Sequence, residues 1–209
     1  MSNASIAAAL LDIGAVAVSP FEPYTWASGL KSPIYCDNRK TLGYPVLRNQ
    51  IVSAFLDIAR PYLEADTVIA GTATAGIPHG MLLADRLDLP FCYVRSKAKE
   101  HGTSSYIEGA QVLDRSVILV EDLVSTGGSS IQAAAHIHDS GGALVHILSI
   151  FSYELPLSTQ RFSEKGLTLH SLTGLTDLMA VLHERHPDWV EPLRAWREDP
   201  QAWSARMTA

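Results

Sequence analysis

The segment VILVEDLVSTGGSS, residues 117–130, joins an apolar run to two acids and then to a turn of small polar residues. Four consecutive apolar residues, 117–120, are typical of a strand that is buried on both faces of a parallel sheet. We expect a strand over 116–120 that ends at the two acids, and a helix from Ser129 to about Asp139. This order of strand, polar turn and helix predicts an α/β domain.

The same order recurs on both sides of this segment. Apolar runs predict strands at 67–70, 90–94 and 143–151, with shorter extended segments at 15–18 and 32–36. Helical spacing predicts helices over 3–11 and 77–87 and from Pro45 onward. Ligands of such sheets bind outside the carboxyl ends of the strands. The loops 71–76, 95–108 and 121–129 follow such ends and are therefore expected to face one crevice.

The tail from Thr173 onward is expected to form two helices that are separated near Pro187. Trp189, Trp196 and Trp203 repeat every seven residues, a spacing that favours a packed helical face over a recognition surface. The chain shows no internal repeat and no linker, so one domain over residues 1–209 is expected.

Composition restricts the classes of function. The 209 residues are 47% hydrophobic and 18% charged, as in a globular protein. A net charge of −6 argues against broad binding to nucleic acid or an anionic membrane. No apolar stretch approaches about 18 residues, and the N-terminus is not a signal peptide, so a cytoplasmic location is expected. Cys36 and Cys92 are expected to be reduced thiols.

The turn and the acids suit different parts of one ligand. Glycines leave main-chain amides accessible, hydroxyls add donors, and the helix N-terminus adds a positive partial charge, which together suit a phosphate. Glu121 and Asp122 repel phosphate and suit sugar hydroxyls or a metal. Their side chains point to opposite faces if the strand continues, so at least one reaches the ligand. The segment fits a sugar phosphate, and a capped turn beside a solvated acidic pair is the plainer alternative.

Three motifs in this order resemble a known family. Residues 117–130 resemble the 5-phosphoribosyl-1-pyrophosphate (PRPP) motif of type I phosphoribosyltransferases. Residues 26–39, WASGLKSPIYCDNR, resemble the N-terminal signature of orotate phosphoribosyltransferases, and residues 95–102, RSKAKEHG, resemble their catalytic lid. The resemblance implies the type I phosphoribosyltransferase fold, a central parallel sheet flanked by helices. It places the core at about 45–170 and a small hood at about 1–40, to which C-terminal helices can add.

The implied reaction transfers ribose 5-phosphate from PRPP to N1 of orotate, giving orotidine 5′-monophosphate and pyrophosphate in pyrimidine biosynthesis. The resemblance implies Mg²⁺ held through the substrate, with no direct protein ligand assigned. It also implies a homodimer in which the lid loop 95–108 completes the neighbouring site. Lys99, His101 and Asp122 are the catalytic residues that it assigns.

The resemblance further assigns binding residues. Those for PRPP are Arg95, Lys99, His101, Glu121, Asp122, Leu123, Val124, Ser125, Thr126, Gly127, Gly128 and Ser129. Thr72, Ala73 and Thr74 form a pyrophosphate loop, in which a cis peptide bond between Ala73 and Thr74 is predicted. Ser125 is assigned to orotate, with Lys31 as a second candidate.

The segment that resembles the lid can also be interpreted from its residues alone. Arg95, Lys97, Lys99 and His101 place four cationic or titratable groups within seven residues, which would attract a pyrophosphate and shield it from water. A solvated basic loop is the alternative, and the PRPP motif makes it the weaker one. Two departures from the family concern lysines that some members carry, because Ala27 and Ala75 stand at those positions. No counterpart is found for the arginine that grips orotate in some members.

Two other functions fit parts of the pattern. A purine-type phosphoribosyltransferase would share the PRPP motif but should lack the 26–39 signature and this lid. The segment 71–76 has the outline of a nucleotide-binding loop but lacks the lysine that such a loop requires. A PRPP-sensing transcription regulator would need a DNA-binding segment, and the N-terminal region shows no basic recognition helix.

Overall fold

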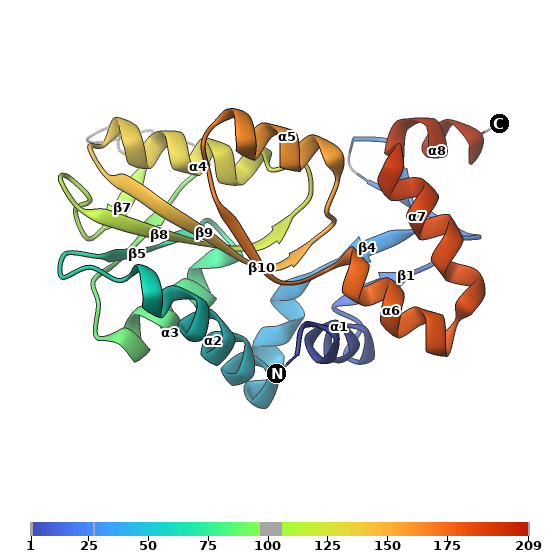
Figure 1. Ribbon diagram of the computed structural model, residues 1–209, viewed down its shortest axis with the longest axis horizontal. Coiled ribbons are helices and arrows are strands. Elements are labelled where there is room, and N and C mark those ends of the chain that lie inside the picture. The colour runs from blue at the N-terminus through green and yellow to red at the C-terminus, as the bar shows by residue number, and fades with distance from the viewer. Residues whose placement is uncertain (1, 27, 97–105, 209) are drawn as a thin grey trace.

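A parallel sheet runs through the middle of the protein (Figure 1). The computed structural model of the chain describes residues 2–26, 28–96 and 106–208. Within these residues the sheet has six strands, in the order β10 (Leu169–Gly174), β9 (Ala143–Ser152), β8 (Ser116–Val124), β5 (Val68–Thr72), β6 (Phe91–Val94) and β7 (Ile107–Gly109). Only β7 is antiparallel to its neighbour. The predicted α/β architecture is confirmed.

Helices cover both faces of the sheet (Figure 1). On one face lie α4 (Gly128–Asp139) and α5 (Pro156–Glu164), and on the other lie α2 (Pro45–Ala59) and α3 (Gly76–Leu87). Residues of β8 alternate between the two cores: Val117 and Leu119 pack on the α4 side, and Ile118 and Val120 pack on the other. Burial on both faces explains why β8 reads as a continuous apolar run.

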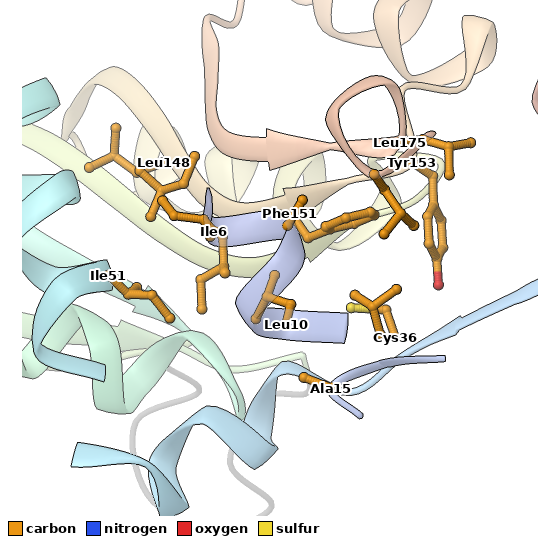
Figure 2. Packing of buried hydrophobic residues seen from close by; sticks show 14 of the residues in the cluster. Ile6, Leu10, Ala15, Cys36, Ile51, Leu148, Phe151, Tyr153 and Leu175 are labelled. Atoms are coloured by element: carbon orange, nitrogen blue, oxygen red, sulfur yellow. The ribbon is translucent and has the colours of Figure 1, made fainter. Parts of the chain in front are cut away.

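The core continues from the sheet to both ends of the chain. Helix α1 (Asn3–Asp12) contacts α6 (Leu175–Arg185) and β10. Figure 2 shows Ile6 and Leu10 of α1 between Ile51 of α2 and Phe151 of β9. All four of these side chains have at most 1% of their surface exposed. The N-terminal helix is therefore part of the main core.

Residues of the N-terminal part of the chain form a smaller unit of short strands. Strand β1 (Val16–Val18) pairs with β4 (Ile34–Cys36), and β2 (Tyr24–Thr25) pairs with β3 (Lys31–Ser32), both antiparallel. A 3-10 helix, η1 (Asn38–Gly43), follows β4. We call residues 15–43 the hood segment. The C-terminal elements η3 (Pro187–Trp189), α7 (Val190–Glu198) and α8 (Pro200–Arg206) pack beside it.

Several boundaries differ from the sequence-based expectations. Strand β8 continues through the acids to Val124, and β7 begins at Ile107, so the loop after β6 is shorter than 95–108. Elements α5 and β10 were not predicted from the sequence. Their segments carry few apolar residues, because α5 buries only Ser158 and Phe162 and β10 is an edge strand.

The expectation for the tail was wrong in two respects. Residues 175–206 form three α-helices and a 3-10 turn, not two helices. Trp196 and Trp203 are both buried, but they lie on α7 and α8, because Asp199 caps a new helix whose first residue is Pro200. The seven-residue repeat of tryptophans therefore does not mark one helical face.

Two further features concern surfaces. No helix in the described part of the chain combines the length and the apolar character needed to cross a bilayer. A cavity of about 860 Å³ lies between α1, α2 and β10 and is lined by residues such as Asn49, Asp57 and His170. This cavity is separate from the carboxyl ends of the central strands, where ligands of parallel sheets bind. The size of a cavity is therefore no guide to the position of the ligand site in this protein.

Candidate active site at the carboxyl ends of the central strands

Glu121 lies near the end of β8 and joins that strand to α4. Its side chain is 4% exposed. One carboxyl oxygen accepts the hydroxyl protons of Ser129 (3.1 Å) and Ser130 (3.3 Å), and the other accepts the Asp122 amide at 3.1 Å. These contacts hold the first turn of α4 against the strand, so Glu121 faces the helix rather than open solvent.

The two acids form a coupled pair. Burial raises the pKa of Glu121 to about 8, and the nearby charge of Asp122 adds to that rise. Burial also raises the pKa of Asp122, while hydrogen bonding from Glu121 opposes the rise. Two adjacent carboxyls with restricted hydration do not ionise together readily, so the more buried Glu121 keeps its proton near neutral pH.

Asp122 faces the hood segment. It is less buried than Glu121, and the Arg39 guanidinium favours its ionised form. Arg39 itself pairs with Asp37 at 2.6 Å. The expectation that the two side chains point to opposite faces of the sheet is not met, because the two carboxyls lie close enough to hydrogen-bond to each other. Their other contacts differ, since Glu121 is bonded to the first turn of α4 and Asp122 lies near Arg39 of the hood. Asp122 is the acid that can meet a polar ligand.

The turn after β8 leads into an uncapped helix. Gly127 has a φ of +79°, which favours glycine, and it precedes α4 as the N-cap residue. Glycine has no side chain to cap a helix, so the first amides of α4 are available to a ligand or water. A Cβ on Gly127 would also lie 3.0 Å from Phe162 of α5. The turn therefore has the geometry of an anion site, as its sequence predicts.

The loop after β5 lies beside this turn. Its Ala73–Thr74 peptide bond is cis, which confirms the prediction for that bond. The hydroxyl of Thr72 is buried and has no hydrogen-bond partner among the described residues. A small cavity of about 30 Å³ is lined by Thr72, Ala73, Arg95 and Ser129, among others. The loops after β5, β6 and β8 therefore meet, as the parallel sheet predicts.

Arg95 directly follows β6, at the start of the segment that the family resemblance assigns to a lid. Its guanidinium pairs with Glu108 at 2.8 Å, and Tyr93 donates to the same carboxylate at 2.8 Å. The Arg95 amide donates to the Tyr106 carbonyl at 2.8 Å, so residues 95 and 106 are held together. Lys97, Lys99 and His101, as well as Ala27, lie outside the described residues.

Lys31 extends along the hood rather than into the turn. Its ammonium group donates to the Thr25 hydroxyl at 2.8 Å, and its amide donates to Ser204 of α8 at 2.8 Å. Tyr153 follows β9, where the sequence offers no arginine. Its ring stacks on Trp26 with centroids 5.6 Å apart. The described residues between the hood and the end of β9 therefore include a stacked aromatic pair.

Sequence reasoning missed a buried polar cluster beneath the acids. Asn38, Thr41 and His79 have at most 1% of their surface exposed. Burial lowers the pKa of His79 to about 4, so this imidazole is neutral at pH 7. A polar residue in a short sequence pattern does not reveal such burial, because the partners come from segments far apart in the chain.

The carboxylate oxygens at the crevice suit a metal ion that binds together with a phosphate-containing substrate. Within residues 2–26, 28–96 and 106–208, no group of three or more His, Cys, Asp or Glu side chains could hold a metal ion. The carboxylate of Asp122 is a hard oxygen donor at the crevice. Mg²⁺ commonly uses one or two carboxylates together with substrate phosphates and water. The residues present fit that mode of binding.

Comparisons with known proteins agree with this geometry. Residues 49–165 match the family model described as phosphoribosyl transferase domain. The orotate phosphoribosyltransferase of Bacillus pumilus is 48% identical over 202 residues, which cover 95% of each chain. That of Lactococcus lactis is 45% identical over 204 residues, 96% of this chain and 98% of the other.

A solved structure agrees as well. The crystal structure of orotate phosphoribosyltransferase from Aeropyrum pernix matches with a TM-score of 0.74 and 27% identity, over 86% of this chain and 98% of that chain. The sequence likeness spans nearly the whole of both relatives, and the fold likeness includes the sheet that carries the crevice. The chain therefore belongs to the orotate phosphoribosyltransferase family and has the type I phosphoribosyltransferase fold.

Proposed function

We propose that the chain catalyses the reaction of orotate with PRPP, which gives orotidine 5′-monophosphate and pyrophosphate, a step of pyrimidine biosynthesis. The observation that carries the proposal is identity of 45–48% to orotate phosphoribosyltransferases over 95% or more of this chain. The arrangement of acids and phosphate turn at the end of β8 supports it.

The phosphate turn is proposed to hold the 5′-phosphate of PRPP. The amides of residues 125–129 and the hydroxyls of Ser125, Thr126 and Ser129 supply donors, and Leu123 and Val124 shape the entry to the turn. Asp122 would accept hydrogen bonds from the ribose hydroxyls. Glu121 would support this contact by fixing α4 and the main chain at Asp122.

The reaction needs positioning and charge stabilisation more than covalent catalysis. N1 of orotate, with its proton removed, attacks the anomeric carbon of PRPP. A carbon–nitrogen bond forms while the carbon–oxygen bond to pyrophosphate breaks, and positive charge builds on the ribose ring. Anionic groups beside the ribose and cationic groups around the pyrophosphate stabilise this charge separation. No side chain acts as a nucleophile.

The pyrophosphate is proposed to lie between two segments. Thr72, Ala73 and Thr74 would bind it from the sheet side, where the Thr72 hydroxyl is free to donate. Arg95, Lys99 and His101 would bind it from the lid, where His101 can also share a proton. Exclusion of water by the lid would protect PRPP from hydrolysis.

Mg²⁺ is proposed to accompany PRPP. When bound, it would neutralise charge on the leaving pyrophosphate and favour its departure. Asp122, supported by Glu121, would orient the ribose hydroxyls or water around the ion. We propose no direct protein ligand.

Orotate is proposed to bind beside Ser125, with Lys31 as a second contact. A homodimer is proposed, in which loop 95–108 of each subunit completes the site of the other. A single domain over residues 1–209, with a core over about 45–170 and a hood over about 1–40 to which the C-terminal helices can add, is part of the same proposal. The cytoplasmic location stays a prediction.

The test is a base-competition assay. The chain is mixed with PRPP and Mg²⁺ and with orotate, adenine, hypoxanthine and uracil together, and the consumption of each base is followed. Loss of orotate alone, with release of pyrophosphate, is the expected result. Consumption of a purine instead would favour the purine-type enzyme. PRPP binding without consumption of any base would favour the sensor.

A further inference from the structure

Asn38 joins the hood segment to the strand that carries the acids. Its side chain is fully buried, and its amide nitrogen donates to the main-chain carbonyl of Asp122 at 2.7 Å. The two residues are 84 positions apart in the chain. Asn38 lies in the segment 26–39 that resembles the family signature, but it has no exposed surface to offer a substrate.

The main chain at Asp122 needs such a partner. Strand β5 pairs with β8 only as far as Gly71 opposite Val120, so β8 continues past the end of its neighbour on that side. Buried main-chain carbonyls are nearly always hydrogen-bonded, because loss of hydration is costly. The Asn38 amide supplies that bond at the residue whose side chain faces the crevice.

The main chain of Asn38 is held by a second hydrogen bond. The Thr41 hydroxyl donates to the main-chain carbonyl of Asn38 at 2.6 Å, and the same hydroxyl lies 3.2 Å from Nε2 of His79. The side-chain oxygen of Asn38 has no hydrogen-bond partner among the described residues. The hydroxyl proton of Thr41 is already used, so Nε2 of His79 can donate to Thr41 when the imidazole proton lies on that nitrogen. His79 lies in α3, the helix that follows the loop 72–75.

The chain of contacts therefore links three segments that surround the crevice. The hood supplies Asn38 and Thr41, β8 supplies the main chain of Asp122, and α3 supplies His79. A neutral His79, whose pKa is lowered by burial, adds no charge to the acids above it. Buried networks of this kind favour one arrangement over slightly displaced ones.

We infer that Asn38 is a positioning residue of the reaction, which fixes the main chain at Asp122 and so aims the Asp122 carboxylate at the ribose of PRPP. Displacement of a group by about 1 Å can reduce a rate by roughly a hundredfold. The inference rests on the proposed function, because it assigns the effect to PRPP. It does not make Asn38 a contact of either substrate.

The first variant is Asn38→Ala. This change removes the side-chain amide that donates to the main-chain carbonyl of Asp122, so that carbonyl loses its hydrogen bond. We expect kcat/KM for PRPP to fall about 10- to 100-fold, with a higher KM for PRPP and a lower kcat. Calorimetric titration with PRPP and Mg²⁺, without orotate, should show weaker binding. A folded Asn38→Ala chain with kcat/KM for PRPP within twofold of the wild type would overturn the inference.

The second variant, Asn38→Asp, separates positioning from general loss of structure. A protonated aspartic acid can donate to the Asp122 carbonyl, but an ionised one cannot. The titratable and charged groups around position 38 are Cys36, Asp37, Arg39, Lys40, Arg48, His79, Glu121, Asp122 and Tyr153. Burial beside several acids should raise the pKa of the introduced carboxyl.

Activity of Asn38→Asp relative to the wild type should therefore be higher at pH 6 than at pH 8.5. A ratio that does not change with pH would overturn the inference. If Asn38→Ala does not fold, Asn38→Asp decides alone. Failure of Asn38→Asp to fold at pH 6 would also count against the inference, because the protonated carboxyl replaces the lost donor in nearly the same volume.

Ser116→Ala is the matched control. Ser116 is buried on the same strand, at the end remote from the crevice, and its hydroxyl donates to Glu64 at 2.5 Å. The control should lose stability but keep kcat/KM for PRPP. If the wild type consumes no orotate, the proposed function fails, and the PRPP titration of the Asn38 variants still tests the positioning role. If the wild type is active and the Asn38 variants match it, only the inference fails.

Discussion

Glu121 and Asp122 are adjacent in sequence, yet their surroundings differ. Glu121 accepts hydrogen bonds from Ser129 and Ser130 and is almost fully buried, whereas Asp122 borders the crevice. The two carboxyls still hydrogen-bond to each other, so the difference lies in their other contacts, α4 for Glu121 and the neighbourhood of Arg39 for Asp122. One acid therefore stabilises the first turn of α4, and the other is the one that we propose to meet the ribose of PRPP.

The first prediction concerns Asp122→Asn. The change removes a charge that would accept the ribose hydroxyls, and hydrogen bonds to charged groups contribute about 1.5–3 kcal/mol. We expect kcat/KM for PRPP to fall roughly 10- to 150-fold at pH 7.5, as that range implies. Steady-state kinetics with PRPP as the varied substrate measures it. Normal PRPP affinity together with normal turnover would mean that the acidic pair is structural.

The second prediction concerns the pH dependence of stability. The pKa of Glu121 is raised to about 8 in the folded protein, mainly by burial, and its ordinary value is 4.5. Between these values the folded state keeps a proton that the unfolded state has released. The contribution of Glu121 is therefore fully present below about pH 4.5 and is lost as the pH rises through about 8.

Glu121→Gln should remove this dependence. Between pH 5 and pH 9, the free energy of unfolding of the Glu121→Gln variant should fall less than that of the wild type. The difference should reach as much as a few kcal/mol, at about 1.4 kcal/mol per pKa unit. Urea denaturation at pH 5, 7 and 9 measures the difference. Glu184→Gln, at an exposed position of α6, is the control. Parallel curves for wild type and Glu121→Gln would contradict the prediction.

Among the helices and strands, the best predicted from the sequence are those whose side-chain pattern is compatible with only one kind of structure. The run 117–120 is apolar at every position, which suits only a strand covered on both faces, and β8 is such a strand. The glycines and hydroxyls that follow predicted the turn and the start of α4. Strand β10 escaped prediction because its residues, LHSLTG, are half polar, as an edge strand allows.

The loops of the candidate site could be predicted from the sequence, but the buried contacts beneath them could not. Loops 71–76 and 121–129 follow strand ends, so the topology of a parallel sheet brings them together. The contact of Asn38 with Asp122 depends on how the hood packs on the sheet. No local pattern contains that information, because the partners are set by tertiary packing. The same holds for Thr41 and His79, which meet across two elements.

The third prediction concerns the fit of α3 on β8. Gly76 is the first residue of α3, and a Cβ there would lie 2.3 Å from the carbonyl oxygen of Val120. A main-chain atom cannot move aside as a side chain can, so helix and strand would have to separate. We expect Gly76→Ala to lower the free energy of unfolding by about 1–3 kcal/mol or more.

Chemical denaturation measures the effect of Gly76→Ala. Gly43→Ala is the control, because a Cβ at Gly43 would meet no atom within 4 Å. The control should change stability by less than about 1 kcal/mol. Equal stability of the two variants would show that α3 can shift along the sheet without loss.

The fourth prediction concerns the lid. Lys99 lies outside the described residues, and its role follows from the family resemblance alone. Lys99→Ala should reduce kcat about 100-fold, because a lost electrostatic contact to the transition state typically has an effect of this order. The melting temperature should change little, since the resemblance assigns Lys99 to a lid, and lids contribute little to a core. Lys165→Ala, at the exposed end of α5, is the control. Unchanged turnover would remove the lid from the mechanism.

At the scale of the whole molecule, the two ends of the chain hold the crevice together. Trp26 of the hood contacts both Tyr153 and Trp196, with ring centroids 5.6 and 5.7 Å apart. Figure 2 places Tyr153 beside Cys36 of β4, and the hood amide of Lys31 donates to Ser204 of α8. The C-terminal helices therefore fix the hood against the end of β9, on the side proposed for orotate.

The same scale includes the proposed homodimer, which can be tested by mixing two inactive variants. If the lid of one subunit completes the site of the other, then Lys99→Ala and Asp122→Asn damage complementary parts of each site. In a hybrid dimer one site carries both changes and the other carries neither. Random exchange of subunits makes half of the dimers hybrid, so activity should return to about one quarter of the wild type.

The measurement is the turnover of orotate after the two variants have been unfolded together and refolded, with each variant refolded alone as a control. Activity that stays at the level of the separate variants, while light scattering shows a dimer, would mean that each lid serves its own subunit. A monomer by light scattering would remove the shared site altogether. Recovery to about one quarter requires the lid to cross between subunits, because no other arrangement restores an intact site from these two lesions.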